Sequence, residues 1–287
     1  MNKPLDELLG LLDLERIEVN LFRGHSPTDR WQRVYGGQVI GQALVAANRT
    51  VKDRICHSLH GYFLRPGDPK VPILYEVDRS RDGRSFTSRR VVAIQHGKQI
   101  FHLAASFQIE EEGLNHQEDF PNVLGPDELL TEDELRKKIA EKLPDEFKES
   151  FLVKNWPVEV RPIDPVDLLN PEPREPKQFN WFRARSEIPN DVALHQCVLA
   201  YMSDMTLLDT CTNPHGINFM NPKLRSASLD HAMWFHRPFK ANEWLLYQQD
   251  SPSASGARGF NRGNIFNTDG KLIASVAQEG LIRVTGE

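Results

Sequence analysis

Residues 35–47 read YGGQVIGQALVAA and join three glycines to an apolar run of helical length. A Walker phosphate-binding loop would need Lys-Ser or Lys-Thr after its last glycine, but Gln42 and Ala43 follow here. A dinucleotide fingerprint would need G-x-G-x-x-G inside a parallel βαβ unit, whereas two of these glycines are adjacent and antiparallel strand patterns come next. The stretch therefore predicts a helix from about Gln38 to Arg49 that is followed by an antiparallel sheet.

The same order of elements occurs twice in the chain. After the first helix, β-rich runs divided by turn signals predict strands at 57–64, 71–80, 85–95 and 99–108. A strand pattern at 179–187 then precedes a second apolar run of helical length at 191–209. Further strands are predicted at 228–239, 243–254, 258–267 and 271–284.

Three short matches hold the two copies in one register. The longest pairs YFLRPG at 62–67 with WFHRPF at 234–239. The other two, RSF with RGF and HGK with DGK, keep the same offset of about 173 residues. This period is far longer than that of a solenoid repeat, so we infer a duplicated αβ unit.

Composition divides the chain into three parts. Residues 115–176 hold nine prolines and two acidic helical segments, and we interpret them as a connector. This connector separates an N-terminal unit at 1–114 from a C-terminal unit at 177–287. Because each unit has an apolar helix and an antiparallel sheet with one face to bury, we predict an α+β fold in which each sheet wraps around its helix.

Composition and charge also exclude several classes of protein. Of the 287 residues, 39% are hydrophobic, which is too many for a disordered chain. The formal net charge of −5 provides no basic field, so we expect no nucleic-acid partner. The first leucines have helical spacing within a short, acid-interrupted run, which predicts an amphipathic helix and no signal peptide or membrane span. Three isolated cysteines fit neither a disulfide scaffold nor a zinc knuckle, so we expect a cytoplasmic location.

Several motifs together resemble the type II acyl-CoA thioesterases, the TesB family, over nearly the whole chain. They are VYGGQVIGQAL, HSLHGYFLRPGD, RDGRSF, PHG, LDHAMWFHRPF, NEWLLY, SPSASGARGF and QEGLIR. The resemblance implies two tandem hotdog units, hydrolysis of acyl-CoA to free fatty acid and coenzyme A, and no cofactor or metal. It further implies a homo-oligomer, either a dimer or a tetramer, and places the family's acid, hydroxyl and amide at Asp204, Ser228 and Gln278.

Asp204 is unusual for physical reasons as well. On a continuous helix its neighbours three and four residues away would be Ala200, Tyr201, Leu207 and Leu208, so its carboxylate would lie on a largely apolar face. A buried acid can be catalytic, or it can cap a following turn. The resemblance favours the catalytic interpretation.

Gln278 presents a similar pattern on a strand. It alternates with Leu272, Ala274 and Val276, which places its amide on the inward face of the sheet. A core glutamine bonded to backbone groups is the alternative. The offset between the copies places Ser106 at the equivalent position, so we expect only the second copy to hold an active centre.

Ser228 by itself is typical of a turn or strand start, and Ser226 is an alternative hydroxyl. The family often has threonine at this position, and serine keeps the hydroxyl. The resemblance implies that Asp204, Ser228 and Gln278 hold a water, with Asp204 as general base or charge partner and the other two orienting the lone pairs of the water. We predict that the Gly37 backbone N–H, at a helix start, polarises the thioester oxygen.

We also predict substrate contacts for His60, Arg84 and Arg258. The coenzyme half of the substrate carries phosphates, which arginines can bind bidentately, although solvated turns are the alternative for any single arginine. His60 and His57 have odd spacing on a strand and so point to opposite faces, which argues against a metal site.

The sequence is also compatible with two other functions. A hotdog acyl-CoA hydratase or dehydratase would pair an acid with a histidine, and no histidine is an obvious partner of Asp204 in the sequence. A non-catalytic acyl-CoA-binding protein would have lost part of the acid, hydroxyl and amide set, all of which is present. The acyl chain-length preference depends on pocket depth, which packing decides.

Overall fold

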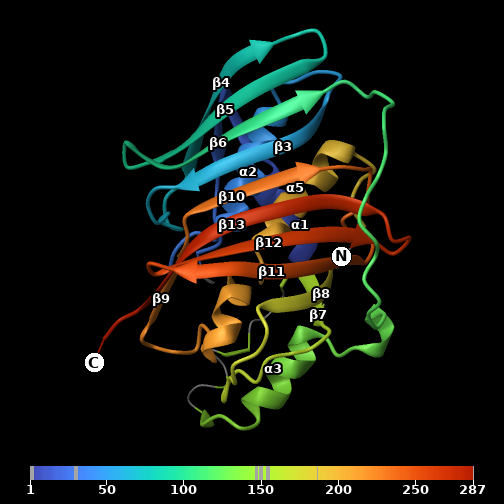
Figure 1. The fold of residues 1–287 in the computed structure, drawn as a ribbon. Coiled ribbons are helices and arrows are strands. Elements are labelled where there is room, and N and C mark those ends of the chain that lie inside the picture. The colour runs from blue at the N-terminus through green and yellow to red at the C-terminus, as the bar shows by residue number, and fades with distance from the viewer. Residues whose placement is uncertain are drawn as a thin grey trace.

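The computed structural model describes residues 3–28, 32–145, 148, 151–152, 156–185 and 187–286. Its strands join in a single sheet that curves around two helices (Figure 1). The first half contains α1 (Lys3–Leu12), β1 (Glu15–Glu18), β2 (Leu21–Gly24), α2 (Gly36–Asn48), β3 (Ile55–Phe63), β4 (Ile73–Asp82), β5 (Phe86–Gln95) and β6 (Lys98–Gln108). The connector contains η1 (Pro126–Glu128), α3 (Glu132–Ala140) and β7 (Val158–Pro162). The second half contains β8 (Lys177–Ala184), α5 (Val192–Ser203), η2 (Leu208–His215), β9 (Leu224–Ser228), β10 (Asp230–Phe235), β11 (Leu245–Ser255), β12 (Arg258–Asn267) and β13 (Leu272–Val284).

The order of the strands reflects the predicted duplication. The sheet runs β1-β2-β4-β5-β6-β3-β10-β13-β12-β11-β8-β7, and β3 pairs with β10 antiparallel at its centre. Outward from this central pair, β6, β5, β4 and β2 on one side correspond to β13, β12, β11 and β8 on the other. The predicted α+β class with two tandem hotdog units is confirmed.

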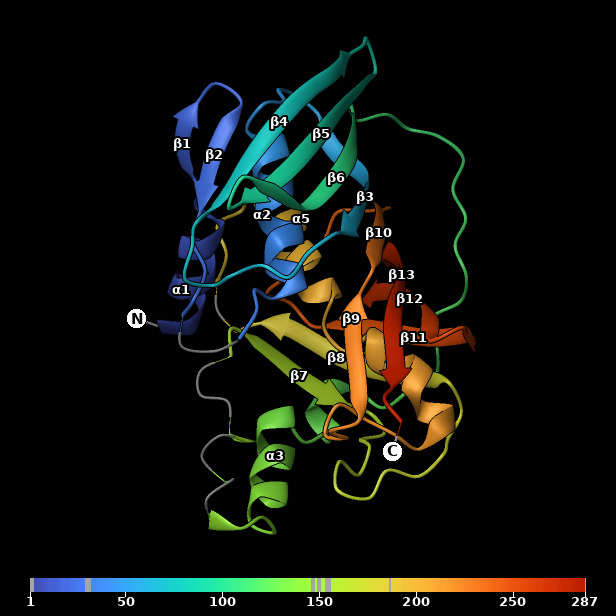
Figure 2. The same ribbon diagram turned by 90° about the vertical axis from the view of Figure 1, so that its left-hand side faces the viewer.

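The two long helices pack against each other inside the curve of the sheet (Figures 1 and 2). Helix α2 is buried from Gly37 to Ala47 because most of its residues are small or apolar, and its two buried glutamines, Gln38 and Gln42, form hydrogen bonds. A Cβ on Gly41 would lie 3.1 Å from the Cys197 carbonyl oxygen of α5. Gly41 therefore allows the close approach of the two helices, and α2 begins at Gly36, two residues before the predicted start.

The second helix is shorter than predicted. Asp191 caps its start by accepting a hydrogen bond from the Ala193 N–H at 2.9 Å, but α5 ends at Ser203 rather than continuing to residue 209. Thr206 then adopts a φ of +62°, which a helix cannot accommodate. The Gln249 side chain supports this turn by donating to the Thr206 hydroxyl at 2.9 Å. Consequently Asp204 lies at the C-terminal end of α5, not within a continuous helix.

The remaining elements frame this core. The predicted N-terminal amphipathic helix is α1, which buries Leu8 and Leu12 against α2. The hairpin β1–β2 and strands β7 and β9 were not predicted from the sequence. Strand β7 comes from the segment 115–176 and pairs with β8, while α3 packs beneath β7 (Figure 2). No helix of the described residues is long and apolar enough to cross a membrane.

Candidate active site

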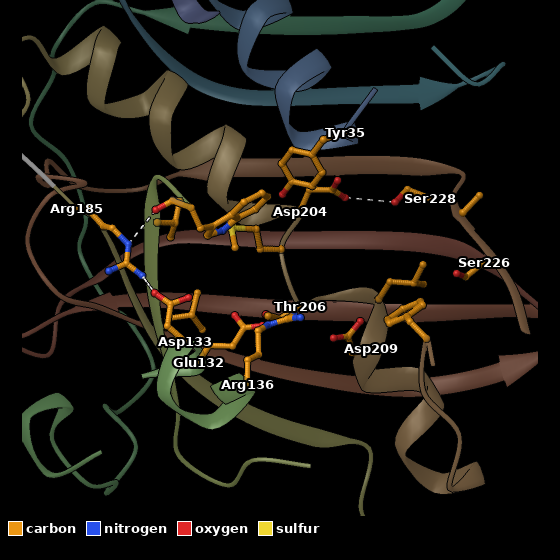
Figure 3. Close-up of a pocket in the computed structure, with 18 residues that line it drawn as sticks. Tyr35, Glu132, Asp133, Arg136, Arg185, Asp204, Thr206, Asp209, Ser226 and Ser228 are labelled. Carbon is orange, nitrogen blue, oxygen red and sulfur yellow. Dashed lines mark hydrogen bonds and ion pairs between the residues drawn. The ribbon is translucent and has the colours of Figure 1, made fainter. Parts of the chain in front are cut away.

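Three separate elements bring Asp204, Ser228 and Gln278 together. Asp204 follows the last residue of α5, Ser228 ends β9, and Gln278 lies within β13. The Gln278 amide Nε2 donates to Asp204 Oδ1 at 2.6 Å. The Ser228 hydroxyl donates to the same oxygen at 3.3 Å, and Figure 3 shows this second bond. The structure thus joins all three predicted side chains at one carboxylate.

Sheet register explains how the hydroxyl and the amide reach this point. Strand β9 pairs with β13, with Ser228 opposite Gly280, two residues along from Gln278. Gln278 alternates with buried Ala274 and Val276, so its amide is directed inward as predicted. Gly280 is required here because a Cβ would overlap the Leu208 side chain.

The first copy contributes the start of α2. A Cβ on Gly36 would lie 2.6 Å from Asp204 Oδ2, and a Cβ on Gly37 would overlap the Tyr201 carbonyl oxygen. The Gly37 backbone N–H donates a hydrogen bond to Asp204. This explains the adjacent glycines of residues 35–47: they let a positively polarised helix start approach the acid of the other copy.

Burial changes the acidity of this carboxyl group. Removal from water raises the pKa of Asp204 from its ordinary 3.8 to about 6, and hydrogen bonds from Gln278, Gly37 and Ser228 hold it below a still higher value. A carboxyl group with a pKa of about 6 is mostly ionised at neutral pH, and its pKa is still close enough to neutral pH for the group both to accept and to return a proton.

A buried histidine fixes the orientation of the Gln278 amide. Ser203 donates its hydroxyl hydrogen to the Ala200 carbonyl at 3.0 Å, so Ser203 Oγ accepts from His231 Nε2 at 2.9 Å. His231 Nδ1 is then an acceptor, and it receives the second N–H of Gln278 at 3.2 Å. Burial lowers the pKa of His231 to about 3, so this imidazole is neutral.

His231 was not predicted from the sequence to lie near Asp204. A signal was available, because His231 alternates with buried Met233 and Phe235 on β10 and must therefore point inward, as Gln278 does. The histidine acts through the amide and does not touch the acid directly.

A cavity of about 470 Å³ lies beside Asp204. Its walls come from the start of α2, the turn after α5, strands β7 and β9, and helix α3 (Figure 3). Ser226 and Ser228 both line it, but no hydrogen bond joins Ser226 to Asp204, which distinguishes the two candidate hydroxyls. Burial and the charge of Glu132 raise the pKa of a second acid in the wall, Asp209, to about 7.

The other predicted substrate-binding residues lie outside this cavity. His60 is exposed on the outer face of the sheet, where its ring meets Trp234 edge-on at 5.1 Å. Arg84 is exposed in the β4–β5 turn, and Arg258 pairs with Glu279 at 2.9 Å. Their contact with substrate stays a prediction.

The equivalent place in the first copy has different chemistry. Ser106, which corresponds to Gln278, bonds the His57 ring at 2.8 Å. Arg49 follows the last residue of α2, as Asp204 follows that of α5. Among the described residues no group of three His, Cys, Asp or Glu is placed to hold a metal ion.

Two family models match the chain. The model described as "Acyl-CoA thioesterase" matches residues 147–281, and "Acyl-CoA thioesterase N-terminal domain" matches residues 25–108. Solved structures agree with the fold. TesB2, an acyl-CoA thioesterase II from Mycobacterium marinum, has 45% identity and a TM-score of 0.77, covering 96% of this chain and 98% of its own.

Curated relatives are similar over most of their length. Acyl-CoA thioesterase 2 of Haemophilus influenzae is 43% identical over 99% of both chains. Acyl-coenzyme A thioesterase 8 of Homo sapiens is also 43% identical, over 96% of this chain and 88% of the relative. With matching models in both halves and this degree of identity along its length, the chain belongs to the acyl-CoA thioesterase family.

Proposed function

We propose that this protein hydrolyses acyl-CoA thioesters to free fatty acid and coenzyme A by direct attack of a water that Asp204 activates. The observation that carries the proposal is the Asp204 carboxylate itself. Its pKa is raised to about 6, it lines a cavity of about 470 Å³, and an amide and a hydroxyl both bond its Oδ1.

The Gln278 amide gives this site a place for the water. Both of its N–H groups are used, one by Asp204 and one by His231. Its Oε1 is buried and has no hydrogen-bond partner among the described residues, and we propose that it accepts a hydrogen bond from a water, which also donates to Asp204, once the substrate opens room beside it. The amide and the carboxylate then fix the lone pairs of the water for attack.

The proposed reaction proceeds in two steps. Asp204 takes a proton as the water oxygen bonds to the thioester carbon, and the carbonyl oxygen becomes an oxyanion. Its negative charge is stabilised by the start of α2, where the Gly37 N–H, which bonds Asp204 while the acid is ionised, is our candidate donor once Asp204 has taken the proton. The carbon–sulfur bond then breaks, and Asp204 returns its proton to the coenzyme A thiolate.

Thiol release from butanoyl-, octanoyl- and hexadecanoyl-CoA tests the proposal. We expect release by the wild type, and a loss of at least about a hundredfold in kcat for Asp204→Asn, because removal of a general base typically costs this much. Ser228→Ala should lower kcat, whereas Ser226→Ala, which changes the same cavity wall without a bond to Asp204, should not. Full activity of Asp204→Asn would refute the role of this acid.

We further propose a cytoplasmic location and a homo-oligomer. The three cysteines are free and buried, as is usual in a reducing compartment. Tyr62 and Trp234, 55% and 37% exposed, lie on the outer face of the central strands β3 and β10, which offers an apolar surface to a second copy. Light scattering of the purified protein tests this, and a monomer at micromolar concentration would refute it.

A further inference from the structure

A second cavity, of about 620 Å³, adjoins the catalytic cavity. The two have six lining residues in common, namely Glu132, Arg136, Val160, Thr206, Asp209 and Phe219. They are therefore neighbours across a shared boundary between α3 and the turn after α5.

Much of the lining of the second cavity is apolar. Leu135 and Ile139, one turn apart on α3, face it, as do Leu168 and Leu169 from the segment after β7. Phe219 lies on its rim and is 48% exposed, as is the adjacent Met220. Two large apolar side chains exposed side by side at a cavity are typical of a surface that an apolar ligand covers.

The charges in this lining do not favour phosphates. Its cationic residues are Arg136, Lys138 and Lys142, and its anionic residues are Glu132, Asp164, Asp167 and Asp209. Asp209, with a pKa of about 7, is only partly ionised near neutral pH, so the acids and bases nearly balance and the cavity provides no positive field to attract the multiply charged coenzyme half of an acyl-CoA. The uncharged acyl half is the part that fits.

We infer that the second cavity holds the distal part of a long acyl chain, and that helix α3 of the connector is the wall that sets chain-length preference. This inference rests on the proposed thioesterase function. The chain runs from the thioester beside Asp204 past Val160 and Phe219, which line both cavities. The ion pair of Arg136 with Glu132, at 2.6 Å, borders this passage, and the arginine also lies over the Phe151 ring at 5.5 Å.

The inference predicts how rate depends on chain length. Each methylene buried in the second cavity should raise kcat/KM by up to about fourfold, the equivalent of about 0.8 kcal/mol. Short chains end within the catalytic cavity and should gain nothing from α3.

Ile139→Trp fills the second cavity from the α3 side, and Lys137→Trp places the same side chain on an exposed part of the helix that lines neither cavity. We expect Ile139→Trp to lower kcat/KM for hexadecanoyl-CoA by about tenfold or more while butanoyl-CoA changes less than about twofold. The Lys137→Trp control should retain the wild-type profile.

Each outcome of this experiment decides the inference. An equal fall in the kcat/KM of Ile139→Trp for all chain lengths, or no fall for hexadecanoyl-CoA, would overturn the inference. If Ile139→Trp does not fold, Met220→Ala replaces it, at an exposed residue that lines the second cavity but not the catalytic one, with the same selective loss for long chains expected. Failure of the thioesterase proposal is distinguishable, because the wild type would then release no thiol from any chain length.

Discussion

Replacement of Asp204 by asparagine should stabilise the protein while it removes activity. The native carboxyl group has a pKa of about 6 against an ordinary 3.8, and this difference corresponds to about 3 kcal/mol at 1.36 kcal/mol per pKa unit. Between these two pH values the folded state binds more protons than the unfolded state, so ionisation of Asp204 lowers stability as pH rises. The destabilisation is complete above about pH 6 and absent below about pH 4.

Asparagine keeps the shape of the side chain and one oxygen for Gln278, but it carries no charge to desolvate. At about 2 °C per kcal/mol for a chain of this size, the unfolding temperature of Asp204→Asn at pH 8 should lie about 6 °C above that of the wild type. The same comparison at pH 4 is the control, and the two proteins should then unfold together. An unfolding temperature of Asp204→Asn below that of the wild type at pH 8, or the same difference in unfolding temperature at both pH values, would refute the raised pKa of Asp204.

Further predictions concern the same centre. The kcat/KM of the wild type should rise with pH to a plateau above about 6, because the ionised form of Asp204 is the base, and a flat profile between pH 5 and 8 would contradict this. His231→Gln should lower kcat by about tenfold with little change in KM, since the neutral histidine only orients Gln278. The pH dependence of kcat/KM should stay as in the wild type, and a shift of that pH dependence would show that His231 titrates. Gly36→Ala should reduce kcat far more than Gly113→Ala, because a Cβ at residue 36 would lie 2.6 Å from Asp204 Oδ2 whereas a Cβ at residue 113 would meet no heavy atom within 4 Å. Equal activities would rule out this contact.

Local sequence patterns predicted most of the strands, because alternation and glycine turns specify them directly. Strand β12 spans Arg258–Asn267, the range predicted. The end of α5 could not be predicted in this way, since the left-handed turn at Thr206 depends on Gln249, which arrives from β11. Pairing of β7 with β8 likewise depends on tertiary contacts, because β7 belongs to a proline-rich segment whose composition favours loops.

In the candidate site, too, local patterns predicted some residues, and tertiary contacts decided the others. Asp204 and Gln278 stand out in a single sequence because each is polar within an apolar pattern. His231 follows the same pattern, but its bond to Gln278 requires β10 and β13 to be neighbours. The depth of the cavities could not be predicted at all, because their walls combine α3, the turn after α5 and the loop before β9.

Each of the two duplicated halves contributes a different part of one candidate site, whereas two identical halves would form the site twice. The glycine-rich helix start comes from the first copy and the acid from the second, so the reacting centre lies across the seam where β3 meets β10. Fusion of the copies in one chain supplies one glycine-rich helix start for one acid, in a fixed ratio. At the opposite end of the seam, Arg49, in the place of the acid, pairs with Asp13 at 2.6 Å and helps to hold the N-terminal helix.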